Sequence, residues 1–324
     1  MSNLYKEYEN GIRGFHQRIN SELTILLYHG VTDVQSQGIE NYSKKHISVD
    51  TFLAQIKYLK KNCNTISIED YLAFRENRES LPPKTVIITF DDGFKNNYTT
   101  AAPILDELGL PAVFYVCGGV VDTDLMFWVD ILEDCLNLCK KNTIEIELDK
   151  RHCFMIDNQR HKIDALEKIK TYCKSTSKTK KDEIVRDVQK ETEIEACVER
   201  SPNYEKITWE QLREMQGSSL FTIGGHSMHH DILSRLSAER LENEIRYSLD
   251  LLELNLKTSI CHYAYPEGQI GHYNDIVINI LKKNGIICSP TALPGLNPLD
   301  MDLFHLRRIM VGVNGLPFPF YITS

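Results

Sequence analysis

Two adjacent aspartates follow a strongly apolar run in the first third of the chain. Asp91 and Asp92 stand in the segment TFDDG, directly after the residues TVII. Neighbouring carboxylates at the end of a buried strand are costly, because like charges repel and burial disfavours ionisation, and a metal ion would offset both costs. An Asp-Asp-Gly turn that simply closes a strand is the alternative. The pair is therefore a candidate for metal binding.

Three histidines follow a second short apolar run. His226, His229 and His230 lie within five positions of the segment GGHSMHH. Two imidazoles and one carboxylate around an ion leave a position open for water, which is typical of a catalytic metal site. A spacing of four residues would place His226 and His230 on one face of a helical turn. Spacing alone leaves open which two histidines bind, and His229 is equally compatible with a solvent-facing position.

Three further segments place polar residues beside apolar runs. They are Tyr28-His29-Gly30, the segment AYPEG at residues 264–268, and the segment HLRRI at residues 305–309. Each has a structural alternative, respectively a histidine bonded to backbone, a Pro-Gly turn, and surface charge beside a last strand. If these segments follow parallel strands, they gather at the end where α/β barrels build active sites.

The elements that would position these residues are short apolar strands that alternate with amphipathic helices. Runs that are apolar throughout suit strands buried on both faces of a parallel sheet or barrel. Helical periodicity appears after Ser48, after Ser237 and before Asn284-Gly285, each a typical helix boundary. This alternation predicts an α/β fold. The predicted strands are Thr24–Tyr28, Thr85–Phe90, Ala112–Cys117, Phe221–Gly224 and Ile260–Tyr265.

One interval breaks the alternation. Residues 127–201 are charged and helical in pattern, and include the polar run KSTSKTKKDE at residues 174–183, which is typical of a solvated face. We interpret this interval as a helical insertion. The predicted organisation is an N-terminal extension at residues 1–20 and one barrel formed by residues 21–126 and 202–324, with the insertion between its two parts.

Composition excludes some classes of function. The 324 residues are 42% hydrophobic and 25% charged, with a net charge of −8, so a nucleic-acid binder with a basic surface is not expected. No apolar stretch approaches the length of a membrane span, and the N-terminus lacks the pattern of a secretory leader. The nine cysteines are scattered without a C-x-x-C pair. This usage predicts a reduced, cytoplasmic protein.

The two main motifs resemble those of a known enzyme family. TFDDG at residues 89–93 and His226-Ser227-x-x-His230 are similar to the first two motifs of the polysaccharide deacetylases of carbohydrate esterase family 4, the NodB-homology group. The resemblance implies a distorted (β/α) barrel. It also implies that Asp91 is the catalytic base, and that Asp92, His226 and His230 bind a divalent metal, most simply Zn²⁺.

Other segments extend the resemblance and also depart from it. The segment LYHGV at residues 27–31 is similar to the Tyr-His signature of the branch that includes poly-N-acetylglucosamine deacetylases, which implies that His29 is the general acid. The third motif of the family commonly carries an arginine that holds the catalytic aspartate, and Ala264 stands at that position. Arg308 is a candidate replacement from another strand. His305 is the second candidate for the acid.

The expected function is hydrolysis of the N-acetyl group of an amino sugar in a glycan or glycan precursor. Tyr265, Pro266, Arg308 and Trp128 are the candidate substrate-binding residues. Trp128 would offer a stacking surface for a sugar, or else would pack in the core of the insertion. Two alternatives stay open, namely hydrolysis of another C–N bond of an amide or imide on the same scaffold, and a non-catalytic glycan-binding module.

Overall fold

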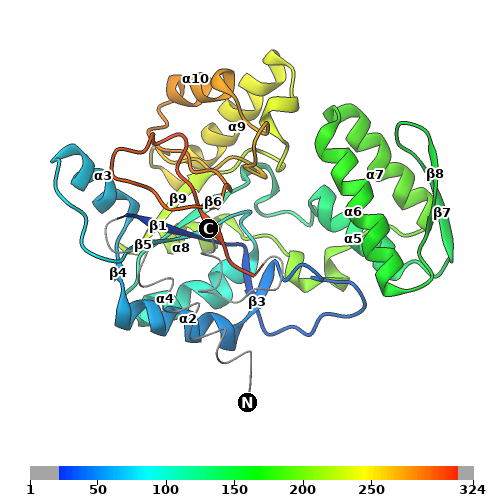
Figure 1. The fold of residues 1–324 in the computed structure, drawn as a ribbon, viewed down its shortest axis with the longest axis horizontal. Coiled ribbons are helices and arrows are strands. Elements are labelled where there is room, and N and C mark those ends of the chain that lie inside the picture. The colour runs from blue at the N-terminus through cyan, green and yellow to red at the C-terminus, as the bar shows by residue number, and fades with distance from the viewer. Residues whose placement is uncertain (1–21, 313–324) are drawn as a thin grey trace.

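The computed structural model describes residues 22–312. The predicted extension at residues 1–20 and the last part of the second barrel segment, residues 313–324, lie outside the described residues. Figure 1 shows a main body that carries the sheet, with a separate group of helices and a hairpin projecting from one side. This arrangement agrees with the α/β fold class that the sequence predicts.

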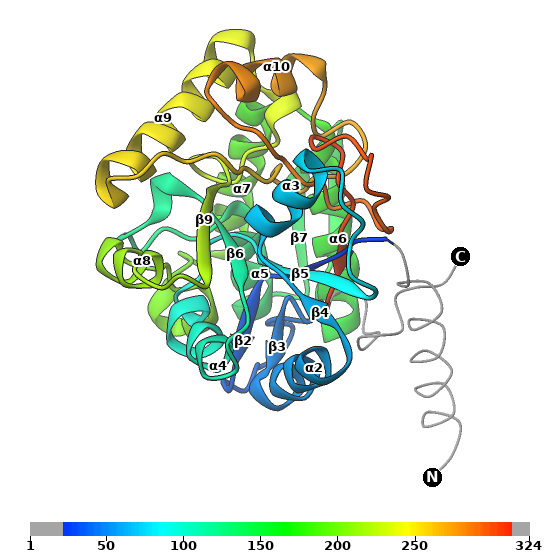
Figure 2. The ribbon, with the colours of Figure 1, turned by 90° about the vertical axis from the view of Figure 1, so that its left-hand side faces the viewer.

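A parallel sheet forms the centre of the main body. Its strands run in the order β10-β1-β5-β6-β9, and β4 pairs with β5 beside this path. Every pairing in this sheet is parallel. Helices α2, α4, α8 and α9 lie around the outside of the strands (Figure 2). The strands of this sheet are β1 (Thr24–Tyr28), β4 (Asn64–Thr65), β5 (Thr85–Phe90), β6 (Ala112–Val116), β9 (Phe221–Gly225) and β10 (Ile309–Met310).

The apolar runs of the sequence form the innermost strands. All residues of β1, β5 and β6 are buried, as expected for strands covered on both faces. The predicted bounds of Thr24–Tyr28 and Thr85–Phe90 are confirmed. The predicted strand Ile260–Tyr265 is wrong, because this segment forms only isolated bridges at His262 and Tyr263. Pro266 has no N–H to continue a ladder, and Glu267 turns the backbone with φ +60°.

The helices of the main body begin and end at the signals in the sequence. The hydroxyl of Ser48 accepts a hydrogen bond from the N–H of Thr51 at the start of α2, and α10 ends at Lys283 with Asn284 as its C-cap. Helix α10 buries Val277, Ile278 and Leu281, so the helix predicted before Asn284-Gly285 is confirmed. These helices are α2 (Val49–Asn62), α3 (Ile68–Glu76), α4 (Ala102–Glu107), α8 (Trp209–Gln216), α9 (Ala238–Leu256) and α10 (Asp275–Lys283). A short parallel pair, β2 (Gly30–Thr32) and β3 (His46–Ser48), lies beside them.

The projecting group corresponds to the interval that the sequence sets apart. It contains α5 (Trp128–Leu138), the antiparallel hairpin of β7 (Thr143–Glu147) and β8 (Arg151–Met155), α6 (Gln159–Ser175) and α7 (Lys178–Thr192). Their apolar faces form a hydrophobic cluster of their own. The helical character of this interval agrees with its three helices, whereas the hairpin was not predicted. Residues 143–147 alternate exposed and buried side chains, which is the two-residue period of a strand.

No helix among the described residues is long and apolar enough to span a membrane.

Candidate metal centre and active site

The aspartate pair lies where β5 ends. The N–H of Asp91 donates to the carbonyl of Tyr28 at 3.0 Å, which extends the pairing of β5 with β1 by one residue. Asp92 and Gly93 then turn the chain with φ values of +82° and +81°. Each aspartate is 4% exposed. The end of the strand therefore holds both carboxylates inside the protein.

The two histidines predicted as ligands come from the turn after β9. The N–H of His226 donates to Val116, and its Nδ1 lies 2.8 Å from the carbonyl oxygen of Ala264, which leaves Nε2 free to bind a metal. The N–H of His230 donates to the hydroxyl of Ser227 at 2.9 Å. The predicted helical turn is wrong, because Ser227 and His230 have φ values of +68° and +61°.

Three of these side chains fit a divalent metal ion. One ligand atom from each of Asp92, His226 and His230 lies within 4.8 Å of the other two. Asp92 Oδ1 and His226 Nε2 are buried without a hydrogen-bond partner, 3.5 Å apart. Buried polar atoms in proteins are normally satisfied, so this pair of facing acceptors favours a bound cation. His229 is exposed and lies outside the group, so the geometry favours the pair predicted from the resemblance.

Arg308 binds the remaining carboxylate. Its Nη1 and Nη2 donate to the two oxygens of Asp91, each at 2.7 Å, and its Nε donates to the carbonyl of Thr291 at 2.7 Å. Arg308 is 1% exposed. A bidentate, charge-assisted pair of this kind fixes the orientation of the carboxylate. Arg308 thus contacts Asp91 and does not line the cavity, where a substrate-binding residue would have to lie.

Both carboxylates are held in the ionised form. Burial raises the pKa of Asp91, but the guanidinium of Arg308 and the imidazole of His226 lower it by more than burial raises it. The net pKa is therefore below its usual value. The pKa of Asp92 lies well below its usual value, since His230 and His226 outweigh the effect of burial. Ionised carboxylates are required both of a metal ligand and of a proton acceptor.

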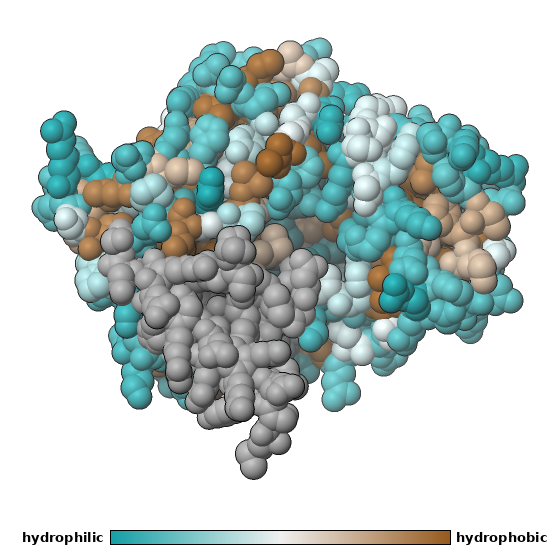
Figure 3. All heavy atoms as spheres, viewed as in Figure 1, coloured by the Kyte–Doolittle hydropathy of each residue, from teal (hydrophilic) through white to brown (hydrophobic). Residues whose placement is uncertain are grey.

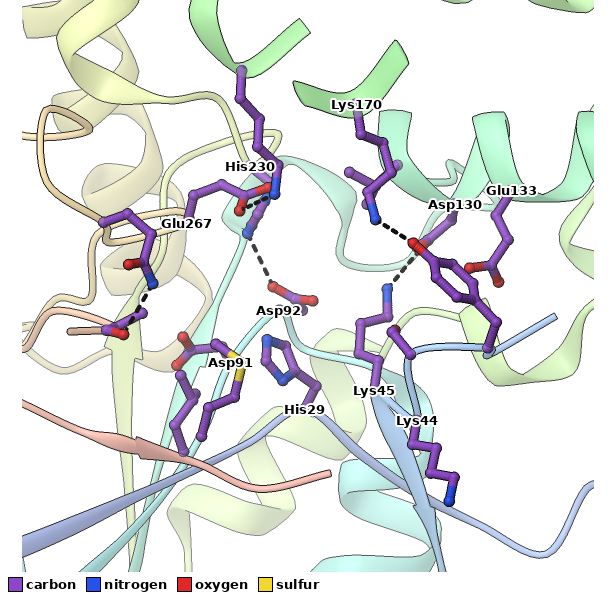
Figure 4. Close-up of a pocket in the computed structure, with 18 of the residues that line it drawn as sticks. His29, Lys44, Lys45, Asp91, Asp92, Asp130, Glu133, Lys170, His230 and Glu267 are labelled. Atoms are coloured by element: carbon purple, nitrogen blue, oxygen red, sulfur yellow. Dashed lines mark hydrogen bonds and ion pairs between the residues drawn. The ribbon is translucent and has the colours of Figure 1, made fainter. Parts of the chain in front are cut away.

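A cavity of about 700 Å³ opens over these residues. In Figure 4, His29, Asp91 and Asp92 lie on one side of it, with Lys45 and Lys170 on the other. The surface is recessed between the main body and the projecting group (Figure 3). A volume of this order is within the usual range of small-molecule sites, about 300–1,000 Å³.

Most of the far wall of the cavity was not predicted. It is formed by the loop before β3 and by α5 and α6 of the projecting group. Helix α6 places Lys170 and Lys174 four residues apart on one face, a pattern that is visible in the sequence but ordinary for an exposed helix. The polar side chains of this wall are Tyr42, Ser43, Lys44, Lys45, Asp130, Glu133, Glu167, Lys170 and Lys174.

Glu267, which follows Pro266 in the third motif, also faces the cavity. Its Oε2 accepts a hydrogen bond from the ammonium Nζ of Lys174 at 2.6 Å. Burial raises the pKa of Glu267, but the charges of Lys174 and then His230 lower it more, to about 2. The ionised carboxylate therefore stabilises the folded protein at pH values above 4.5, the ordinary pKa of a glutamate. This stabilisation is lost as the pH falls towards about 2.

Glu267→Gln is accordingly expected to make the free energy of unfolding depend less on pH in the acid range. The wild type should lose unfolding free energy more steeply than the variant between pH 4.5 and about 2, the interval between the ordinary and the folded pKa. Urea unfolding at several pH values measures this. Glu239→Gln, in the exposed first turn of α9, is the matched control. Equal slopes for Glu267→Gln and the wild type would show that the carboxylate is not held ionised by the fold.

The other candidate residues lie at different depths. Tyr265 is 1% exposed and donates its hydroxyl to Phe304, and neither it nor Pro266 lines the cavity. Trp128 is 6% exposed and packs in the hydrophobic cluster of the projecting group. His305 packs beside Tyr273 and is not among the described residues that line the cavity, whereas His29 is.

Comparison with known proteins decides the family. The family model described as polysaccharide deacetylase matches residues 78–288, which include the aspartate pair and both histidines. The chain belongs to the polysaccharide deacetylase family. Its predicted class, a carbohydrate N-deacetylase, is thereby confirmed, and metal dependence is a general property of this family.

Relatives of the deacetylase share its fold more than its sequence. It is 21% identical over 307 residues to YxkH of Bacillus subtilis (strain 168), assigned to the polysaccharide deacetylases, covering 94% of this chain and 77% of that protein. It is 33% identical over 101 residues to the poly-β-1,6-N-acetyl-D-glucosamine N-deacetylase of Escherichia coli (strain K12), covering 30% of this chain and 14% of that protein. The structure of the Streptococcus pyogenes deacetylase PplD in complex with acetate matches with a TM-score of 0.59 at 19% identity, covering 90% of this chain and 93% of that one. That likeness confirms the distorted (β/α) barrel type of fold.

Proposed function

We propose that this deacetylase hydrolyses the N-acetyl group of an amino sugar in a short glycan or glycan precursor, with Zn²⁺ as the metal. The observation that carries the proposal is the arrangement of Asp91 beside the three ligands. Asp91 Oδ2 lies 3.9 Å from His226 Nε2, and Arg308 holds the carboxylate from behind. A general base is thus placed next to the ion that would bind the substrate.

The residues divide the reaction between them. A divalent cation held by Asp92, His226 and His230 would polarise the amide carbonyl and lower the pKa of a water molecule. Asp91 accepts a proton from the attacking water, because its carboxylate is ionised and points into the cavity region. His29 donates a proton to the departing amine. The products are acetate and a free amino group on the sugar.

His29 is suited to this task by its position. It lies beside Asp91 and Asp92 at the cavity (Figure 4), and its Nδ1 is buried without a hydrogen-bond partner. The net pKa of its imidazole is lowered, because burial outweighs the charges of Asp92 and Asp91, which raise it. We expect His29→Gln to lower kcat by about 10²-fold, a typical loss for one acid-base residue. Metal content should stay equal to that of the wild type.

His305, the second candidate for the acid, provides the control for the His29→Gln variant. His305→Gln is expected to leave kcat unchanged, because His305 does not reach the cavity. A loss in His305→Gln equal to that in His29→Gln, at equal metal content, would transfer the role of the acid to His305.

The far wall of the cavity is the proposed surface for the sugar. Lys45 pairs with Asp130 at 2.5 Å, and Lys170 donates to the hydroxyl of Tyr42 at 2.8 Å, so charged and hydroxyl groups line it in fixed orientations. Such groups suit the many hydroxyls of a saccharide. We therefore treat residues 127–201 as an inserted domain that contributes to substrate recognition. A cytoplasmic location stays a prediction, supported by nine cysteines that form no disulfide.

The test combines metal analysis with product detection. The purified protein, loaded with Zn²⁺, is incubated with N-acetylglucosamine oligomers and with nucleotide-linked N-acetylamino sugars, and released acetate is measured. Acetate release that requires the metal supports the proposal. Metal binding with turnover only of other amides or imides would favour the second enzymatic alternative. Glycan binding without any hydrolysis would favour a non-catalytic module.

A further inference from the structure

We propose that Lys181 of helix α7 is a positioning residue for the ligand His230, so that packing of the inserted domain and metal binding are coupled. This inference rests on the proposed metal site. It goes beyond it by assigning to the inserted domain, residues 127–201, a role in holding one of the three ligands.

The main contact joins α7 to the residue that follows the ligand. Asp231 is 2% exposed, and its carboxylate accepts the ammonium groups of Lys181 and, at 2.9 Å, of Lys178. Lys181 is itself only 8% exposed, and its ammonium lies 5.6 Å from the centre of the Trp128 ring. A buried carboxylate beside a ligand is thus neutralised by residues about 50 positions earlier in the chain.

The two histidine ligands differ in what holds them. His226 is fixed by the sheet, since its backbone bonds to Val116 of β6 and its ring bonds to Ala264. His230 lies beyond the sheet in a left-handed backbone conformation, with φ +61°. A non-glycine residue keeps such a conformation only when its surroundings enforce it. The hydroxyl of Ser227 supplies one restraint, and the ion pair at Asp231 supplies the next.

Two more residues of the inserted domain act on the same ligand, Phe127 by direct ring contact and Lys174 through Glu267. The ring of Phe127 lies 5.4 Å from the ring of His230, centre to centre. Lys174 of α6 binds Glu267, whose charge acts on His230. One residue of the inserted domain therefore contacts this ligand, and two others bind its neighbours Asp231 and Glu267. A ligand whose orientation depends on this contact binds metal less tightly when the contact is removed, and by reciprocity bound metal favours the packed position of α7.

The experiment measures metal affinity rather than turnover alone. Zn²⁺ affinity is determined by competition with a chelator for the wild type, K181M and K180M. Lys180 is the matched control, because it is adjacent in α7 and does not contact Asp231. We expect K181M to bind Zn²⁺ about 10–100-fold more weakly, the usual cost of losing a residue that orients a ligand. K180M should match the wild type, and K181R, which keeps the cation, should recover most of the affinity.

A structural role and a positioning role give different results. If K181M only loosens the fold, its thermal stability falls while the Zn²⁺ affinity of the folded protein stays equal to that of K180M, and this would overturn the inference. With a positioning role, kcat at saturating Zn²⁺ returns towards the wild-type value. Because Lys178 also contacts Asp231, K178M/K181M should lose more affinity than K181M.

The wild type provides a test that needs no variant to fold. Amide hydrogen exchange in α7, residues 178–192, is compared with and without Zn²⁺. Slower exchange in α7 on metal binding is expected, and protection confined to the β5 and β9 turns would contradict the coupling. If the wild type binds no divalent metal and releases no acetate, the proposed function fails as well. If both are present and α7 is unaffected, the coupling alone fails.

Discussion

Asp91→Asn is expected to abolish turnover while the metal stays bound. Asp91 is not one of the three residues whose ligand atoms lie close together. Its replacement therefore leaves Asp92, His226 and His230 in place. An asparagine side chain cannot accept a proton from the attacking water, and the loss of a general base typically costs about 10²–10⁴-fold in rate. Acetate release and metal content, measured on the same preparation, check both parts of the expectation.

The control is the neighbouring residue. Asp92→Asn should lose the metal as well as the activity, because Asp92 Oδ1 faces the two imidazoles at 3.5 Å and 3.3 Å. The two variants differ by one position in the chain and should differ in metal content. Acetate release by Asp91→Asn comparable to that of the wild type, at equal metal occupancy, would refute the role of Asp91 as the base.

The strands and the ends of strands were predictable because they depend on local sequence. The run TVIITF is apolar apart from its two threonines and is buried at every position, as suits a strand covered on both faces. Asp91 and Asp92 follow it directly, so their place at the end of the sheet follows from the place of the strand. The turn from Gly225 to His230 was harder, because positive φ values at Ser227 and His230 are imposed by their neighbours and leave no signal in residue type.

The wall of the cavity was not predictable from one sequence for a different reason. Lys170 and Lys174 read as an ordinary solvated helix face, and they face the site only because the inserted domain packs against the main body. Tyr42 and Lys45 lie in a loop without a recognisable motif. Contacts between distant segments decide these positions, and hydrophobic periodicity carries no information about them.

Arg308→Met is expected to impair both stability and catalysis. The guanidinium makes two bonds of 2.7 Å to Asp91 in a site where Arg308 is 1% exposed. Removing one partner of a buried ion pair leaves an uncompensated charge, which typically costs about 3–5 kcal/mol. Without Arg308 the pKa of Asp91 should rise, because burial then acts with less opposition. Urea unfolding measures the loss of stability, and the pH profile of kcat measures the change at Asp91.

The pH profile separates a positioning role from a purely structural one. Asp91 must be ionised to act as a base, so a raised pKa moves the acid limb of the profile to higher pH, whereas simple loss of folded protein lowers the rate equally at all pH values. Arg307→Met, an adjacent change on the exposed side, should alter neither stability nor the profile. Arg308→Lys keeps a positive charge but cannot bind both oxygens in one plane, so it should fall between the two. If the acid limb of the kcat profile is unshifted in Arg308→Met, the ionisation of Asp91 does not depend on Arg308. The metal ligands alone would then keep Asp91 ionised.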